Sequence, residues 1–191
     1  MNRSQFAHTV RAAAAVLGVN KVLVIGSQAA HASLPGLFPA IHRSIETDIA
    51  FLDDEDGRMA DLVDGSIGEA SLFQETHGYY AQGVEPKTAI LPTGWKRRLV
   101  PFSSAETGGV TAYCLELHDL WISKAMAGRP KDREFCAELI QRRCVDVRTL
   151  EERLRKVKGQ LPEKIAVARS WIQPPRTRSR AGPTARRDRQ E

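Results

Sequence analysis

The hydrophobic pattern at the start of the chain predicts a helix followed by a buried strand. Apolar residues recur at spacings of three and four over residues 4–17, with Ser4 as the expected cap and Gly18 as the stop. Residues 21–25 form a run rich in β-branched side chains, which is typical of a buried strand. We expect that strand to end at Gly26, where a short helix of small residues begins.

Beyond this point the pattern predicts several strands and then only helices. Apolar and polar residues alternate over residues 45–51, which favours a strand with one polar face. A helix over residues 59–67 is expected after it. Four further strands are expected between turns rich in proline and glycine, over residues 79–84, 87–91, 97–102 and 110–115. Helical segments then follow one another over residues 115–127, 130–143, 147–157 and 162–172.

This order of elements predicts an α+β fold. A mixed sheet with helices is expected over residues 1–115 and a helical subdomain over residues 116–172. The stretch 173–191 has six arginines against two acids and no apolar side chain larger than proline, so we expect a disordered, arginine-rich tail. Such a tail can hold RNA or DNA through phosphate contacts, or it can simply be solvated.

Composition narrows the class of protein. Hydrophobic residues make up 42% and charged residues 27% of the chain, and no apolar run approaches the roughly 20 residues that a membrane span needs. The first residues show no secretory signal. The 3 cysteines form neither a metal-binding pair nor a disulfide framework, which agrees with a reducing compartment. We therefore expect a cytoplasmic protein with no membrane partner.

The first candidate for chemistry is the bend that Gly26 and Ser27 form between the first strand and the short helix. Such a bend lets backbone N–H groups and a hydroxyl approach a phosphate closely, with the positive end of a helix behind them. The same two residues are also common in a plain turn with a helix cap. On the residues alone, both interpretations stay open.

The second candidate is the pair of acids Glu46 and Asp48. Residues two apart on a strand project from the same face, so both carboxylates can point at one Mg²⁺. Mg²⁺ prefers oxygen ligands and is usually held by one or two carboxylates together with substrate phosphates. The pair therefore suits metal-assisted phosphoryl transfer, although a solvated strand face with two acids would look the same.

The third candidate is a lysine and an aspartate on the apolar faces of two successive helices. Lys124 falls on the stripe that Leu117 and Trp121 bury, and Asp132 shares a face with Phe135. A charged side chain in such a place needs a partner. The two residues therefore predict either part of a binding site or a structural ion pair that closes a helical hairpin.

A basic cluster lies beside an aromatic residue at Trp95, Lys96, Arg97 and Arg98. This combination suits base stacking and phosphate contact. The alternative is the edge of a strand guarded by charge.

The motifs occur together in an order that resembles a known family. They are Ile25-Gly26-Ser27-Gln28-Ala29, then Arg43 with Glu46-Thr47-Asp48, then Asp119-Leu120 with Lys124, Gly128-Arg129 and Lys131-Asp132. Over residues 3–160 the chain resembles the bacterial nucleotidyltransferase-like proteins related to abortive-infection toxins, within a largely uncharacterised branch of that superfamily. The resemblance implies a minimal polymerase-β-like nucleotidyltransferase core followed by helices.

The resemblance also implies roles for the matching residues. Gly26 and Ser27 match the turn that cradles the triphosphate of the NTP, and Glu46 and Asp48 match the paired acids that hold Mg²⁺. The implied chemistry is transfer of a nucleoside monophosphate to a hydroxyl or an amine.

The helical part supplies the remaining matches. Lys124 matches the lysine on the phosphate side, while Arg129 and Asp132 match the arginine and aspartate of the helical motif. On this basis Lys124 and Asp132 are expected to act in catalysis and Lys124 and Arg129 to bind the nucleotide.

Two features keep a second function open. The first acid is Glu46 where the family usually has aspartate, and if Asp48 were the first acid its partner position would be Ala50. A third acid has one candidate, Glu116, which follows a predicted strand. The alternative is a catalytically degenerate nucleotidyltransferase fold that binds a nucleotide, a nucleic acid or a partner protein.

The expected function is therefore Mg²⁺-dependent transfer from an NTP to an RNA, such as tRNA, or to a protein side chain. The resemblance adds a toxin role and a cognate antitoxin protein as partner. A third hypothesis is an RNA-binding module driven by the basic surface and the tail.

Overall fold

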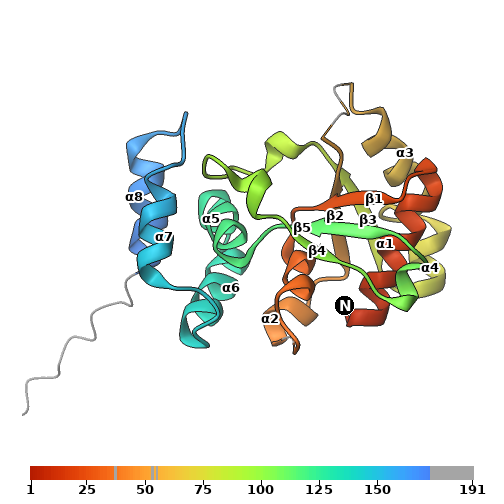
Figure 1. Cartoon of the computed structure of the whole chain (residues 1–191), viewed down its shortest axis with the longest axis horizontal. Coiled ribbons are helices and arrows are strands. Elements are labelled where there is room, and N and C mark those ends of the chain that lie inside the picture. Colours follow the sequence, from red (N-terminus) through yellow and green to blue (C-terminus); the bar gives the residue numbers. More distant parts are fainter. Residues whose placement is uncertain (37, 53, 55, 173–191) are drawn as a thin grey trace, which may run out of the picture.

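The computed structural model describes residues 1–36, 38–52, 54 and 56–172, so the predicted disordered tail lies outside the described residues. At its centre is a five-stranded sheet in the order β3-β2-β1-β5-β4 (Figure 1). The strands are β1 (Lys21–Val24), β2 (Glu46–Ala50), β3 (Tyr80–Val84), β4 (Val100–Phe102) and β5 (Thr111–Cys114). β1 is parallel to β5 and antiparallel to β2, so the sheet is mixed and the α+β prediction is confirmed.

The first helix, α1 (Arg3–Leu17), buries one face against β1, β2 and β3. Phe6, Val10 and Ala13 on this face are fully buried, as the spacing predicts. The predicted stop is confirmed, because Gly18 has a φ of 65° and ends the helix in the left-handed conformation. The predicted cap is wrong: Asn2 caps the helix and forms a capping box with Gln5, which satisfies the first backbone N–H groups one half-turn earlier than the pattern indicates.

Three further α-helices lie between the strands in the described residues. They are α2 (Pro39–His42), α3 (Arg58–Ile67) and α4 (Leu72–His77). The pattern predicts α3, whereas α2 and α4 are too short for their periodicity to be recognised. α1, α3 and α4 lie together on the right of the sheet in Figure 1.

The last described part of the chain is helical, as predicted. It contains α5 (Leu117–Ala127), α6 (Pro130–Gln141), α7 (Val147–Leu154) and α8 (Pro162–Ser170), which gather on the left in Figure 1. α5 is the central helix, since it contacts α6, α7 and α8. The fully buried Trp121 donates its indole N–H to the Cys136 carbonyl at 3.0 Å and so joins α5 to α6.

Two predicted strands are wrong or shortened. Residues 87–91 form no strand: Pro86–Thr88 is a short 3₁₀ helix, η2, and the following apolar residues pack against the core as a loop. The predicted strand 97–102 begins only at Val100, because Trp95–Arg98 is a 3₁₀ helix, η3. The basic cluster is therefore not a strand edge.

A buried ionic network ties η3 to α5 and α7. The side chain of Asp119 is 1% exposed and accepts hydrogen bonds from Arg98 at 2.8 and 3.1 Å and from Arg153 at 2.9 Å. Glu116 caps α5 and is bonded to Arg153 and to Nδ1 of His118. Burial alone would raise the pKa of Glu116, but His118 and Arg153 outweigh it and lower this pKa to about 2.

In the ranges given above, no helix has the length and apolar character required to cross a membrane. Cys114 and Cys136 are buried and Cys144 is partly exposed, and all three are free thiols.

Candidate functional site

The sheet topology brings three segments to one edge. β1 and β5 are parallel, with Val24 opposite Cys114, so both strands end at the same edge. The bend after β1 and the start of α5 therefore lie close together. The antiparallel partner β2 reaches this edge with its first residues, and the Ile25 N–H donates to the Asp48 carbonyl at 3.2 Å.

The alternation in β2 places both predicted acids on one face. Thr47 and Ile49 are fully buried on the core side, while Glu46 and Asp48 lie on the other side and are partly exposed. The Tyr80 hydroxyl on β3 donates to Oε2 of Glu46 at 3.1 Å and so holds this carboxylate. The sequence prediction of a shared face is confirmed.

Gly26 is required at the bend because the Asp48 side chain occupies the space beside it. A Cβ atom at position 26 would lie 1.5 Å from Oδ2 and 2.9 Å from Cβ of Asp48. No side chain can be accommodated there unless the carboxylate moves. The glycine thus serves a close approach rather than an unusual backbone angle, since its φ is −92°.

Charges from three elements act on Asp48. Burial raises its pKa above the usual value, Lys124 lowers it, and Glu46 raises it again. Arg129 and Lys131 lower it by smaller amounts. The net effect is a carboxyl group whose charged form is poorly solvated and would gain from a bound cation.

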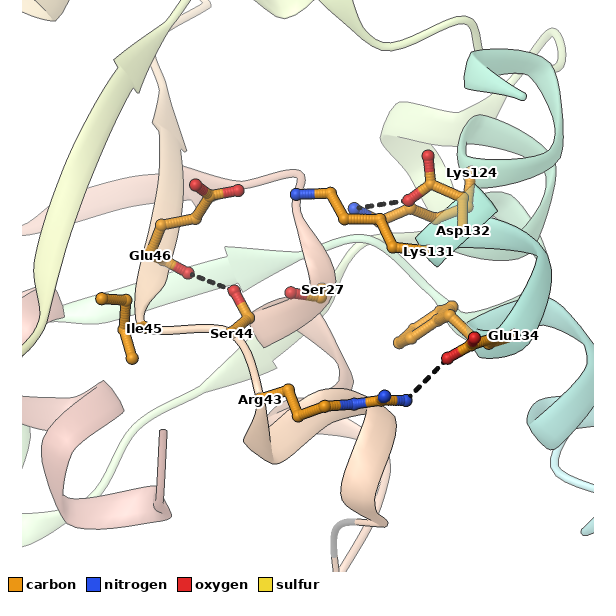
Figure 2. A pocket seen from close by; sticks show the side chains of 10 residues that line it. Ser27, Arg43, Ser44, Ile45, Glu46, Lys124, Lys131, Asp132 and Glu134 are labelled. Carbon is orange, nitrogen blue, oxygen red and sulfur yellow. Dashed lines mark hydrogen bonds and ion pairs between the residues drawn. The ribbon is translucent and has the colours of Figure 1, made fainter. Parts of the chain in front are cut away.

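The larger cavity at this edge has a volume of about 500 Å³. Its lining carries both signs of charge; the residues are Ser27, Arg43, Ser44, Ile45, Glu46, Lys124, Lys131, Asp132, Glu134 and Phe135. Figure 2 shows that Lys131 extends from α6 toward Glu46 on β2. At the rim, Arg43 and Glu134 form an ion pair of 2.9 Å.

A second cavity of about 300 Å³ contains Asp48, Gly26 and Arg129. Lys124 lines both cavities, so this lysine lies between the space beside Glu46 and the space beside Asp48. The structure therefore brings the two acids, the bend and Lys124 together, although each acid lines a different cavity.

The predicted pair of Lys124 and Asp132 is present. Nζ of Lys124 lies 3.6 Å from Oδ1 of Asp132, and Arg129 binds the same carboxylate at 2.6 and 3.3 Å. The hydrogen bond with Asp132 raises the pKa of Arg129. Asp132 is 2% exposed and engaged by two cations, so it positions both of them rather than offering a free ligand.

The bend itself is held by buried side chains. Ser27 lines the larger cavity and begins the 3₁₀ helix η1 (Ser27–Ala32). The buried Gln28 donates its amide to the carbonyls of Ile41 and Ser44 at 3.2 and 3.3 Å. These bonds fix the segment that leads into Glu46.

The predicted third acid, Glu116, does not join the pair. Glu116 is turned into the ionic network with Arg153 and lines neither cavity. On β3 the residues in register with Glu46 and Asp48 are Tyr80 and Gln82. Among the residues that the structure describes there is no group of three or more acidic, histidine or cysteine side chains placed to hold a metal ion.

Four residues of the site have no role predicted from sequence: Lys131, Arg43, Glu134 and Tyr80. The helical pattern favours the outward side of α6 for Lys131, and its long side chain nevertheless reaches the cavity. Its position next to Asp132 is a usable signal. Arg43 stands in a motif that carries the family resemblance, although the resemblance gives it no role. Glu134 and Tyr80 depend on contacts between distant segments and leave no local pattern.

A comparison with protein families gives one result. The model of a family described as nucleotidyltransferase of unknown function (DUF6036) matches residues 5–170. Neither a curated protein nor a solved structure matches the chain.

Proposed function

Because the chain belongs to the DUF6036 family of nucleotidyltransferases of unknown function, we propose that it transfers a nucleoside monophosphate from an NTP to an acceptor hydroxyl or amine. One observation supports this proposal above the others. Glu46 and Asp48 lie on the same face of β2, and Lys124 lines the cavity of each, at the edge where the strand β1 ends in a glycine bend.

Glu46 and Asp48 fit a magnesium ion in the chemistry of their donor atoms. Both offer carboxylate oxygens, which suit a small hard cation that usually keeps waters and substrate phosphates as its other ligands. The raised pKa of Asp48 agrees, since burial outweighs the nearby cations and leaves the ionised carboxylate poorly solvated, which a directly bound cation would relieve. When bound, Mg²⁺ would shield the charge of the triphosphate and activate the attacking group.

The chain's own residues divide the remaining work. Lys124 lies between the cavities and offers its ammonium to a phosphate, while Asp132 keeps it in place. Arg129 lines the cavity beside Asp48 and Lys131 lines the cavity beside Glu46. These cations would bind the triphosphate oxygens on either side of the acids. The Ser27 hydroxyl, which lines the larger cavity, would contact a phosphate there.

Incubation with each of the four labelled NTPs, Mg²⁺ and total RNA tests the proposal. Wild type is expected to label an acceptor with one of the nucleotides, and Glu46→Ala and Lys124→Ala are expected to reduce labelling by about 10²–10³-fold. Glu75→Ala and Lys164→Ala remove exposed charges elsewhere and serve as matched controls. Equal labelling by Glu46→Ala and Glu75→Ala would contradict the assignment.

A second expected result concerns the bend. Gly26→Ala forces the Asp48 carboxylate out of its position, so Mg²⁺ affinity is expected to fall at least about tenfold, and the fold to lose about 1–3 kcal/mol from overpacking. Isothermal titration calorimetry with Mg²⁺ measures the first effect and urea unfolding the second. Gly36→Ala, where nothing lies within 4 Å of an added Cβ, is the control. If Gly26→Ala binds Mg²⁺ as tightly as wild type, the close approach has no functional role.

Nucleotide binding without transfer is the second candidate function. It is favoured by the neutral residues Tyr80 and Gln82, which lie opposite the two acids on β3, so that this strand adds no carboxylate to the pair. In that case labelled NTP binds in the presence of Mg²⁺ and no acceptor becomes labelled. The same incubation therefore separates the two candidates.

The proposal extends to the acceptor, which would be an RNA or a protein side chain, and to a biological role as a toxin. RNA, including tRNA, and a protein side chain are both acceptors compatible with a hydroxyl or amine nucleophile. A toxin role with a cognate antitoxin protein rests on the sequence resemblance to abortive-infection toxins.

A further inference from the structure

A third cavity of about 390 Å³ lies outside the site described above. It is lined by Leu91, Thr93, Gly94, Trp95, Lys96, Arg97 and Lys158. Three of these side chains are cationic and the other four residues are neutral. The cavity therefore carries a net positive charge together with an aromatic and an apolar wall.

The basic side chains of the 3₁₀ helix η3 lie in two different environments. Residues three apart eclipse each other in such a helix, so Trp95 and Arg98 lie on the same side, and both are partly buried. Arg98 is paired with Asp119 in the buried network, whereas Lys96 and Arg97 are exposed. Lys96 places its ammonium 5.8 Å from the centre of the Trp95 ring. Within the part of the chain that the structure describes, no ion pair involves the three lining cations.

The frame of this cavity is held by backbone contacts. Thr93 donates its N–H and its hydroxyl to the Lys156 carbonyl at 3.0 and 3.1 Å. The Arg98 guanidinium donates hydrogen bonds to the carbonyls of Pro92 and Thr93. The loop is thereby fastened to the end of α7 and to α5, so the cations are presented on an ordered surface.

The same loop leads to the cavity that contains Asp48. Thr88 and Ala89 line the cavity that contains Asp48, and Leu91 lines the basic cavity. Two residues span at most about 7 Å between Cα atoms, so Ala89 of one cavity and Leu91 of the other lie within that distance. A chain of nucleotides that lies in the basic cavity is therefore close enough to extend to Asp48.

We infer that this basic cavity, defined by Trp95, Lys96, Arg97 and Lys158, binds single-stranded nucleic acid and presents it as acceptor to the catalytic acids. The three cations contact consecutive phosphates, and the Trp95 ring provides a face on which a base stacks. The acceptor role rests on the proposed function, whereas the binding does not depend on it.

Fluorescence anisotropy with labelled single-stranded RNA and DNA of about 12 nucleotides tests the inference, since this length falls within common site sizes. The full-length double variant Lys96→Ala Arg97→Ala is expected to bind about tenfold more weakly, and its log–log salt slope to fall by about 0.7 per lost phosphate contact. Trp95→Leu is expected to bind about 5-fold to 100-fold more weakly, while Trp95→Phe keeps most of the affinity. The control is Arg133→Ala Lys164→Ala, which removes two exposed cations outside the cavity.

Further outcomes separate binding in this cavity from binding elsewhere on the chain. A full-length variant with glutamine at the six tail arginines is expected to keep the dependence on Lys96 and Arg97. Loss of all binding in that variant, unchanged binding in the cavity variants, tighter binding to a duplex, or equal competition by polyglutamate would each overturn the inference. Wild type that binds the oligonucleotide through Lys96 and Arg97 but labels no acceptor would identify a failure of the proposed function alone.

Discussion

Replacing Asp48 with asparagine is expected to reduce nucleotidyl transfer by about 10²–10³-fold and to raise the melting temperature of the metal-free protein at pH 7. The first effect follows from the loss of a carboxylate proposed to bind Mg²⁺. The second follows from burial, which raises the pKa of Asp48 in spite of Lys124. The ionised group is therefore less favourable in the fold than in the unfolded chain, and asparagine removes that charge.

The sign of the pH dependence can be stated. A carboxyl group whose pKa is raised by folding contributes stability that is fully present below its unfolded pKa of about 3.9 and is lost as the pH rises through the folded pKa. The groups that act on Asp48 are Glu46, Lys124, Arg129 and Lys131. Melting curves of wild type and Asp48→Asn are thus expected to differ little near pH 3 and to separate as the pH rises.

Magnesium supplies the control for this experiment. A ligand that binds only the folded state stabilises it, so Mg²⁺ is expected to raise the melting temperature of wild type and to leave that of Asp48→Asn unchanged. Glu75→Gln, an exposed acid on α4, should behave as wild type in both conditions. A lower melting temperature of metal-free Asp48→Asn at pH 7 would show that the carboxylate is already compensated within the fold.

The largest expected effect on stability comes from Asp119. Asp119→Ala leaves Arg98 and Arg153 partly buried without their shared carboxylate, and breaking such a pair on one side typically removes about 3–5 kcal/mol of folding free energy. Urea unfolding followed by circular dichroism measures the loss. The control is Asp61→Ala, which removes an exposed acid from α3. A loss below about 1 kcal/mol would mean that Glu116 or water replaces the missing carboxylate.

Asp119 illustrates what the sequence could predict. Its motif with Leu120 contributes to the family resemblance, but the structure places it at the centre of a buried ionic network. Local patterns predict the helices and strands whose periodicity is strong, and they place Glu46 and Asp48 on one face. The patterns also identify Lys124 and Asp132 as charges that need partners. In the structure these two residues pair with each other, and Asp132 also pairs with Arg129.

The remaining differences arise where tertiary contacts override local pattern. The apolar residues 89–91 suggest a strand, yet they pack against the core as a loop between Pro86 and Pro92. Tyr80 meets Glu46 only because β3 lies beside β2, and no spacing in the sequence reveals that register. The close approach of Gly26 to Asp48 likewise depends on the antiparallel pairing of β1 with β2.

The ion pair between Arg43 and Glu134 bears on how molecules gain access to the larger cavity. Both side chains are 65% exposed, and a pair of this kind adds about 0–1 kcal/mol, which is comparable to thermal energy. The contact that spans this side of the entrance, from α2 to α6, is therefore made and broken continually. This contact therefore does not block access to the larger cavity from this side. The selectivity of the protein has to come from the charged side chains that line the cavity.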